Sequence, residues 1–140
     1  AGEFYEDSAP YLDIIKRENL NSIILHTNYI PSEQVKQYFC AADLIVQSYR
    51  SATQSGVTQI AYHFEKPMLV TNVGGLSEIV TDQKVGYVTE VSSKAIADAI
   101  VDFYDNNREA YFSAGAAIEK DRFSWKNMVD GINSLYKTIK

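Results

Sequence analysis

The sequence predicts an α/β protein in which a doubly wound parallel sheet is followed by a helical C-terminal segment. Short apolar runs alternate along the chain with stretches whose apolar residues keep helical spacing. The runs are continuously apolar, which is typical of strands in a parallel sheet that is covered on both faces. After the last such run the apolar residues keep only helical spacing, and this predicts the helical end of the chain.

The composition fits one globular domain over residues 1–140. Hydrophobic residues make up 46% of the chain, and the formal net charge is -5. This charge, without any long run of basic residues, argues against nonspecific binding to nucleic acid. The single cysteine, Cys40, excludes an internal disulfide bond and a multi-cysteine zinc site, and we expect it on a helix as a small core residue.

The first part of the chain is predicted to hold two helices with a strand between them. Residues 8–19 keep apolar residues on one face, with Ser8 as the N-cap, which indicates an amphipathic helix. Residues 22–27 are a short apolar run with β-branched residues and predict a buried strand. A second helix is expected to begin at Pro31–Ser32, because proline favours the first helical turn.

The rest of the chain is predicted to alternate strands with helices and then to become helical. We expect strands at 44–48 and 68–73 and a shorter edge strand at 84–90, with helices at 55–64 and 76–80 between them. Three further helices are expected at 92–105, 107–120 and 124–138. Ser124 is the predicted N-cap of the last helix, whose apolar residues form one stripe.

Small residues follow two consecutive predicted strands, at Ser55–Gly56 and at Gly74–Gly75. Both turns lead from a strand into a helix, and in a doubly wound fold ligands bind beyond the carboxyl ends of the strands. Helix N-termini attract anions, so the two turns fit a phosphate or diphosphate site. Each turn by itself also fits a simpler role, as an N-cap or a compact connection. Neither is a GxGxxG fingerprint or a Walker A sequence.

Four other polar side chains leave two interpretations open. His26 fits a contact with a base or sugar, or a buried or capping histidine. Arg50 fits a partner of a phosphate or of a nearby carboxylate, and Glu78 fits a helix cap or a contact with a ligand hydroxyl. Asp43, before the strand at 44–48, fits a cap or turn residue better than a catalytic acid. No residue is assigned as catalytic, and no metal site is predicted.

The segments ADLIVQSY, EKPMLVTNVGGLSEIV and KVGYVTE, in this order, resemble the C-terminal half of a GT-B-type glycosyltransferase of family 4, the glycosyl transferases group 1. The resemblance runs from the helix at residue 8 to the last helix and is most specific over 66–80. It implies the Rossmann-like, donor-binding domain of an enzyme that transfers a sugar from a nucleotide-sugar to an acceptor. It also implies a retaining, metal-independent hexosyltransferase of glycan or cell-surface polysaccharide synthesis, with no cofactor.

The resemblance assigns the first turn to the donor sugar and phosphates, and the glycine pair to the side of the donor cleft. With the polar residues around these turns, the candidate donor-binding residues are Arg50, Thr53, Gln54, Ser55, Gly56, Thr58, Gln59, Gly74, Gly75 and Glu78. The resemblance further implies that the end of the first predicted strand contacts the base, through His26, Asn28, Tyr29 and Ile30.

The sequence departs from the family where two glutamates eight residues apart usually contact the donor. Ala52 and Ile60 stand at those positions, and neither side chain can accept a hydrogen bond. Gln54, Thr58 and Gln59 are the polar residues nearby. Either the donor is bound through amides and hydroxyls, or donor binding is weakened. The alternative function is therefore a noncatalytic module that binds a nucleotide-sugar or a partner.

The resemblance also predicts what surrounds this chain in its parent protein. The family's first strand-helix-strand and its whole N-terminal acceptor domain are expected to precede residue 1, so we expect residues 1–140 alone to be inactive. A missing central strand would leave a sheet edge open, which favours self-association. We expect a glycan or lipid-linked acceptor and a cytoplasmic location, with the parent soluble or peripheral to the inner face of the membrane.

Overall fold

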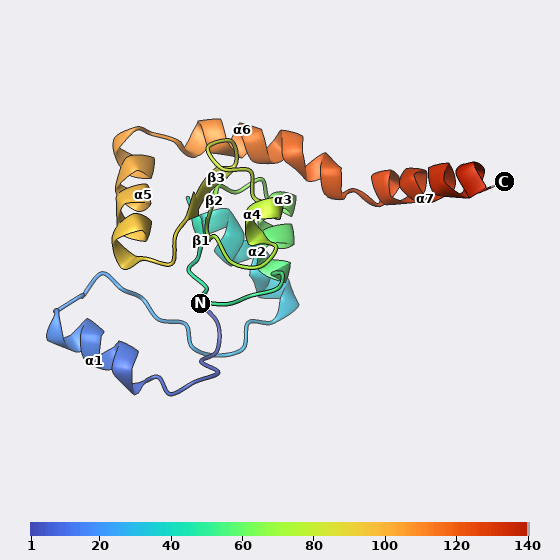
Figure 1. Cartoon of the computed structure of the whole chain (residues 1–140). Helices are drawn as coiled ribbons and strands as arrows, with labels where there is room; N and C mark the ends of the chain where they lie inside the picture. The colour runs from blue at the N-terminus through green and yellow to red at the C-terminus, as the bar shows by residue number, and fades with distance from the viewer. Residues whose placement is uncertain (140) are drawn as a thin grey trace. The chain divides into compact units, whose positions relative to one another are not determined.

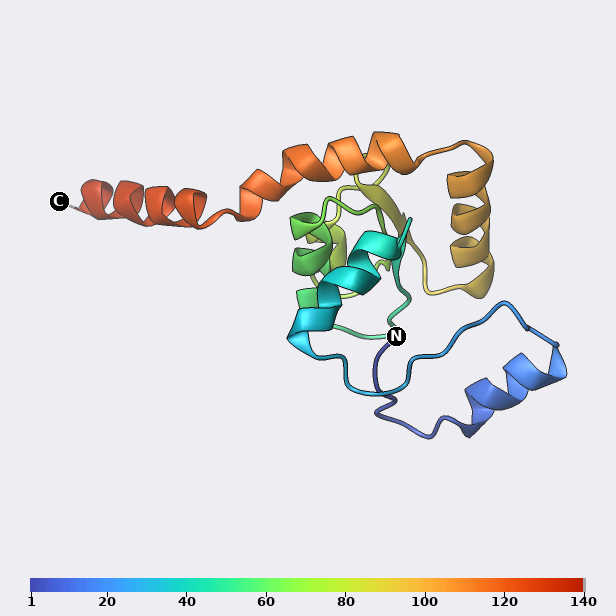
Figure 2. The same cartoon turned by 180° about the vertical axis from the view of Figure 1, so that it is seen from behind.

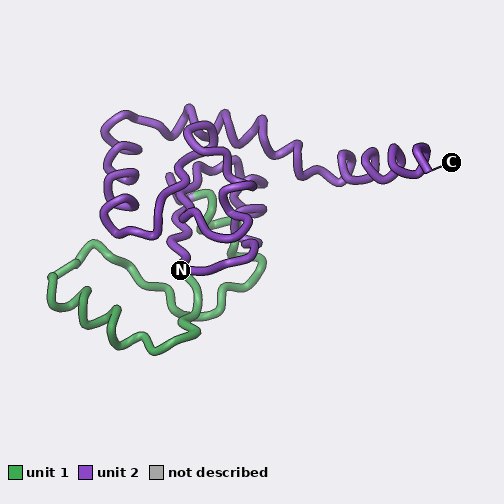
Figure 3. The backbone as a smooth tube through the Cα atoms, in the orientation of Figure 1, with its two compact units in different colours: residues 1–40 green, residues 41–140 purple. Residues whose placement is uncertain are grey.

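The computed structural model describes residues 1–139 (Figures 1 and 2). The chain divides into two compact units, unit 1 over residues 1–40 and unit 2 from residue 41 onward (Figure 3). Among the described residues no helix is long and apolar enough to cross a membrane.

Unit 1 contains the helix α1 (Ala9–Arg17) and nearly all of α2 (Ser32–Ala41), as the apolar spacing predicts. Ser8 is the N-cap residue of α1, as predicted, but its side chain makes no capping hydrogen bond. The carboxylate of Asp7 instead accepts a hydrogen bond from the amide of Ala9 at 3.0 Å. The rings of Phe4 and Tyr11 stack with centroids 5.9 Å apart, so α1 is tied to the segment before it.

Two expectations for unit 1 are wrong. Residues 22–27 are not a strand, and Ile24 within them is 78% exposed. The amide of Gly2 donates to the carbonyl of His26 at 2.8 Å, but no ladder forms, and an apolar run without a partner strand stays irregular. Cys40 lies on α2 as expected, but it is exposed and not a core residue.

Unit 2 is built on a parallel sheet of three strands in the order β1 (Ile45–Gln47), β2 (Met68–Thr71), β3 (Gly86–Thr89). Leu69 of β2 pairs with Val46 on one side and Tyr87 on the other. β3 is an edge strand, which confirms the prediction for residues 84–90. The fourth strand that the sequence predicts, at residues 22–27, is not a strand in the structure.

The strands of unit 2 alternate with helices as the sequence predicts. α3 (Gly56–His63) follows β1, α4 (Leu76–Ile79) follows β2, and α5 (Ser93–Asp105) follows β3. α5 lies on one side of the sheet and α3 and α4 on the other (Figures 1 and 2). The chain then continues through α6 (Glu109–Glu119), a 3-10 turn η1 (Lys120–Phe123) and α7 (Trp125–Ile139). This arrangement confirms the doubly wound parallel sheet with a helical C-terminal segment.

The hydrophobic core of unit 2 joins the sheet to α5 and α6. Leu69, Tyr87, Phe103 and Phe112 are buried in one cluster with Ala99. Tyr87 and Phe112 meet edge to face with ring centroids 5.0 Å apart. Each large apolar side chain buried in this way contributes about 1.5–3 kcal/mol to stability, so this cluster fixes the strands that carry the site.

The last helix carries the predicted apolar stripe on an exposed surface. The amide of Asn127 donates to the hydroxyl of Ser124 at 3.2 Å, which confirms Ser124 as the N-cap. The predicted stripe consists of exposed side chains at helical spacing: Trp125, Met128, Val129, Ile132, Leu135 and Tyr136. The exposed side chain of Ile139 continues it. No side chain of α7 is buried, so α7 adds nothing to the core of unit 2.

Candidate functional site

The two small-residue turns lie at one edge of the sheet. β1 ends at Gln47 and leads through residues 48–55 into α3, and β2 ends at Thr71 and leads through residues 72–75 into α4. β1 and β2 are parallel neighbours, so both turns leave the carboxyl edge of the sheet side by side (Figure 1). This is the edge at which doubly wound folds bind their ligands.

The two turns pack backbone against backbone. The amide of Gly75 donates to the carbonyl of Thr53 at 2.8 Å. Gly74 has a φ of +51°, and a Cβ atom at this position would lie 1.8 Å from the carbonyl oxygen of Ala52. Only glycine fits a left-handed conformation at such a close approach. The glycine pair therefore holds the first turn in place, whatever it does toward a ligand.

The first turn presents the N-terminus of α3. Ser55 has an extended backbone, and its hydroxyl oxygen accepts a hydrogen bond from the amide of Val57 at 3.2 Å, so Ser55 is the N-cap. A Cβ atom at Gly56 would have no heavy atom within 4 Å. The positive end of the helix therefore borders open space at Gly56, where an anion can approach the backbone.

A buried tyrosine fixes the orientation of α3 relative to α4. The hydroxyl of Tyr62, on α3, donates to the carbonyl of Ile79 at the end of α4 over 2.7 Å. Burial, with a smaller effect from the negative charge of Glu119, raises the pKa of Tyr62 to about 12. The phenol therefore stays protonated as a donor, and both helices that follow the two turns are joined.

Thr58 and Gln59 differ from Ser55 in that neither side chain caps α3. Thr58 is fully buried, and its hydroxyl donates to the carbonyl of Ser55 at 2.5 Å, which stabilises the turn from inside. Gln59 lines a pocket of about 270 Å³ together with side chains of α3 and η1, among them His63 and Lys120. Thr58 therefore stabilises the turn, and Gln59 lines a pocket beside α3.

The remaining polar residues of the two turns are exposed. Arg50 makes no ion pair or side-chain hydrogen bond with any of residues 1–139, which removes the interpretation that it pairs with a nearby carboxylate. Glu78 is exposed on α4 and caps nothing within the described residues. The side chain of Gln54 lies against the glycine pair, with its Cγ 3.7 Å from the Cβ position at Gly75.

The first helical turn of α3 contains no acidic residue. Ala52, at one family glutamate position, packs its carbonyl against Gly74, and Ile60, at the other, is half-buried on α3. The first turn therefore offers an anion amides, hydroxyls and the charge of Arg50, while the exposed carboxylate of Glu78 lies on α4 after the second turn.

The four residues expected to contact a base belong to unit 1. His26, Asn28 and Tyr29 are exposed, and Ile30 is half-buried. The His26 ring meets Tyr38 edge to face with centroids 5.4 Å apart. His26 is therefore neither buried nor a helix cap, and its ring edge is supported by an aromatic neighbour.

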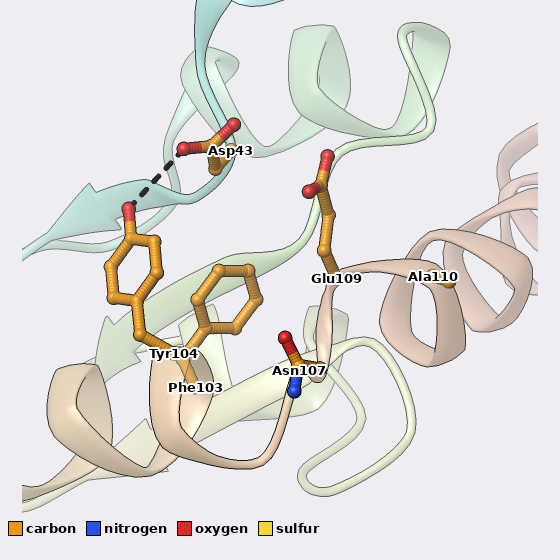
Figure 4. A pocket seen from close by; sticks show the side chains of 6 residues that line it. All are labelled: Asp43, Phe103, Tyr104, Asn107, Glu109 and Ala110. Atoms are coloured by element: carbon orange, nitrogen blue, oxygen red, sulfur yellow. Dashed lines mark hydrogen bonds between the residues drawn. The ribbon is translucent and has the colours of Figure 1, made fainter.

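A separate pocket of about 310 Å³ lies at the opposite, amino end of β1 (Figure 4). Its lining includes Asp43, Phe103, Tyr104 and Glu109, and none of the predicted donor-binding residues. The hydroxyl of Tyr104 donates to Asp43 at 3.4 Å. Burial, followed by the charge of Asp43, raises the pKa of Tyr104. Asp43 is thus a partner of Tyr104 rather than part of the site at the carboxyl edge.

Three buried polar groups near the sheet were not identified from the sequence. Thr71 and Gln47 end β2 and β1, and their only signal was a polar residue closing an apolar run. Glu119 of α6 accepts hydrogen bonds from Lys84 and Arg122, both at 2.5 Å, and these bonds lower its pKa to about 2. Arg122 is only three residues away, but Lys84 is 35 residues away along the chain, so the sequence around Glu119 did not indicate this cluster.

The fold and the sequence have known counterparts. In solved structures the chain aligns with sucrose-phosphate synthase from Thermosynechococcus elongatus at a TM-score of 0.79 and 19% identity, over 99% of this chain and 37% of that one. It aligns with Anabaena HepE in complex with UDP at a TM-score of 0.72 and 19% identity, over 98% and 39%. At these identities the likeness shows the fold, which is that of GT-B glycosyltransferases.

Sequence comparison identifies the family. A D-inositol 3-phosphate glycosyltransferase of Paenarthrobacter aurescens is 28% identical over 115 residues, and one of Acidothermus cellulolyticus is 31% identical over 109 residues. These alignments cover 80% and 68% of this chain but only 28% and 24% of the relatives, so the chain spans about a quarter of their length. The family model for glycosyl transferases group 1 matches residues 2–106, and the chain belongs to that family.

Proposed function

We propose that this chain forms the donor-binding part of a glycosyltransferase that uses a nucleoside diphosphate sugar. The observation that carries the proposal is the pair of interlocked turns at the carboxyl edge of the sheet, with open space beside Gly56 at the N-terminus of α3. Membership of the family and the UDP complex of a protein with the same fold support it.

In this function the chain's own groups bind and stabilise a diphosphate. The amides at the start of α3 and the guanidinium of Arg50 face the negative charge, and they stabilise it further as the sugar leaves. Thr53, Gln54 and Ser55 supply polar contacts to the sugar, with the glycine pair beside it. Thr58, Gln59 and Glu78 complete the proposed donor-binding set, and His26 to Ile30 are the proposed contacts with the base.

Calorimetry on the whole protein with UDP, GDP and their sugars tests this proposal. We expect micromolar binding of one nucleotide and its sugar, unchanged by a metal chelator, together with transfer of the sugar. Absence of any nucleotide binding would overturn the proposal. We also propose that the anomeric configuration is retained, which the product's anomeric NMR coupling checks.

A second candidate is a noncatalytic module that binds a nucleotide-sugar or a partner. The absence of carboxylates at Ala52 and Ile60 and in the first turn of α3 favours it. Nucleotide binding by the whole protein without any sugar transfer would establish this candidate. Residues 1–140 alone are expected to transfer no sugar in either case, because the chain spans only 24–28% of the curated relatives.

We propose self-association through β1, and a cytoplasmic location for the parent with a glycan or lipid-linked acceptor. β1 is an outer strand of the sheet within residues 1–139, and Val46 on it is 43% exposed. Exposed strand edges recruit other chains. Light scattering of residues 1–140 should show a dimer that grows with concentration and is suppressed by Val46→Lys, and a monomer at every concentration would exclude it.

A further inference from the structure

Thr71 links β2 to the first turn beyond the end of the sheet. The paired residues of β1 and β2 end at Gln47 and Val70. The hydroxyl of Thr71, the next residue of β2, donates to the carbonyl of Tyr49 at 2.5 Å. Thr71 is fully buried, so its hydroxyl has no competing water. The side chain thus extends the connection between the strands to the second residue after β1.

The residue that Thr71 holds is itself close to the cap of α3. The phenol oxygen of Tyr49 lies 3.5 Å from the hydroxyl oxygen of Ser55. That same oxygen of Ser55 accepts the amide of Val57 at 3.2 Å. A continuous set of contacts therefore runs from the buried end of β2, through Tyr49, to the N-terminus of α3.

We propose that Thr71 is a positioning residue of the donor site, which acts through Tyr49 and Ser55 to hold the amides of α3 ready for a diphosphate. This inference rests on the proposed function. A loop that is already ordered loses less conformational entropy when the ligand binds, so affinity depends on the contacts that order it. The glycine pair holds the turn at Ala52 and Thr53, and Thr71 holds it at Tyr49.

The test compares three variants of the whole protein: Thr71→Val, Thr71→Ser and Thr89→Val. Valine keeps the shape of threonine but removes the hydroxyl, and serine keeps the hydroxyl. Thr89, on β3, is the matched control, because its hydroxyl lies 3.5 Å from the Val70 carbonyl and does not contact the turn. Binding is measured by calorimetry with UDP or GDP, whichever binds the unaltered protein more tightly.

We expect Thr71→Val to raise the Kd about tenfold, as the loss of one hydrogen bond of ordinary strength implies. Thr71→Ser and Thr89→Val should stay within about threefold of the unaltered protein. Hydrogen exchange without nucleotide should become faster at residues 50–57 in Thr71→Val alone. The exchange measurement needs no ligand, so it tests the positioning even if the nucleotide is not bound.

Several outcomes overturn the inference. If the unaltered protein binds nucleotide and Thr71→Val binds it equally well, the positioning role is wrong while the proposed function stands. If exchange at residues 50–57 stays unchanged, Thr71 does not order the turn. If Thr71→Val does not fold, Tyr49→Phe replaces it, since this removes only the exposed hydroxyl beside Ser55; an unchanged Kd in that variant would refute the link to the cap.

Discussion

The amide of Gly75 donates a hydrogen bond to the carbonyl of Thr53 at 2.8 Å, so the turn after β2 holds the turn after β1. The two turns are separate in the sequence, and each leads into a different helix, α3 or α4. In the folded protein they form one backbone surface, because parallel neighbouring strands bring their carboxyl ends together. The geometry of the α3 N-terminus therefore depends on residues twenty positions further along the chain.

Gly74→Ala and Gly56→Ala should have opposite effects. At position 74 alanine must adopt a φ of +51° with its Cβ 1.8 Å from the Ala52 carbonyl, so we expect a loss of at least about 2 kcal/mol in unfolding free energy. At position 56 the Cβ meets nothing within 4 Å, and stability should stay the same or rise by up to about 1 kcal/mol. Chemical denaturation of both variants measures these changes.

The same Gly56→Ala variant should bind the nucleotide less tightly although it folds well. Its methyl group would occupy the open space beside Gly56, and we expect it to obstruct a phosphate that approaches the backbone amides there. We expect an increase in Kd of about tenfold by calorimetry. Undiminished affinity in a stable Gly56→Ala protein would show that the diphosphate does not bind at this turn.

Arg50→Gln should lower the affinity for the diphosphate without changing stability. Arg50 is exposed and has no ion pair within residues 1–139, so nothing in the fold depends on its charge. We expect the Kd to rise about tenfold at low salt, with a smaller difference at high salt because exposed charges are screened. Lys94→Gln, which removes an exposed charge paired with Asp98 on α5, is the control and should leave the Kd unchanged.

Glu119 should make the stability of unit 2 sensitive to acid. Its hydrogen bonds to Lys84 and Arg122 lower its pKa to about 2, below its value in the unfolded chain. The stabilisation is therefore complete above about pH 4.5 and is lost as the pH falls toward 2. Glu119→Gln should reduce stability at pH 7 by about 2 kcal/mol. It should also make the melting temperature depend less on pH between pH 4.5 and pH 2.

The exposed ion pair of Lys94 and Asp98 provides the comparison for Glu119. Their side chains are 82% and 63% exposed, so Asp98→Asn should change stability by less than about 0.5 kcal/mol at pH 7. An acid profile of Glu119→Gln that is parallel to that of the unaltered protein would refute the assignment of acid sensitivity to this carboxylate.

Local periodicity predicted most of the fold. The helices at α3, α5 and α7 follow from apolar residues at helical spacing, and the caps Ser55 and Ser124 from the residue types that favour caps. The prediction of a strand at residues 22–27 is wrong because a strand depends on its partner and not only on its own apolar residues. Ser8 is at the predicted N-cap position, but the side-chain oxygen that accepts the amide of Ala9 belongs to Asp7, one residue earlier.

The sequence predicted where the two turns of the candidate site lie, but not the contacts within them. The position of both turns follows from the order of strands and helices. The close packing of Gly74 on Ala52, the bond from Thr71 to Tyr49 and the burial of Thr58 all depend on distances between segments, which no local pattern contains. The cluster at Glu119 was missed for the same reason, because Lys84 and Glu119 lie 35 residues apart in sequence and meet only in the folded chain.

Gln47→Leu should stabilise the protein. Gln47 closes β1 and is only 4% exposed, and neither its amide oxygen nor its amide nitrogen has a hydrogen-bond partner within residues 1–139. A buried polar group without a partner costs about 1–3 kcal/mol relative to a satisfied one, and leucine fills a similar volume. We expect the unfolding free energy to rise by about 1 kcal/mol, measured by chemical denaturation, while exposed Gln37→Leu changes it by less than about 0.5 kcal/mol. A clear loss of stability in Gln47→Leu would mean that the amide is satisfied in solution, by a water or by a small movement of the turn. Such a loss would mean that a polar side chain is needed at position 47. Position 47 ends β1 and lies next to Thr71, whose hydroxyl contacts the carbonyls of both Gln47 and Tyr49.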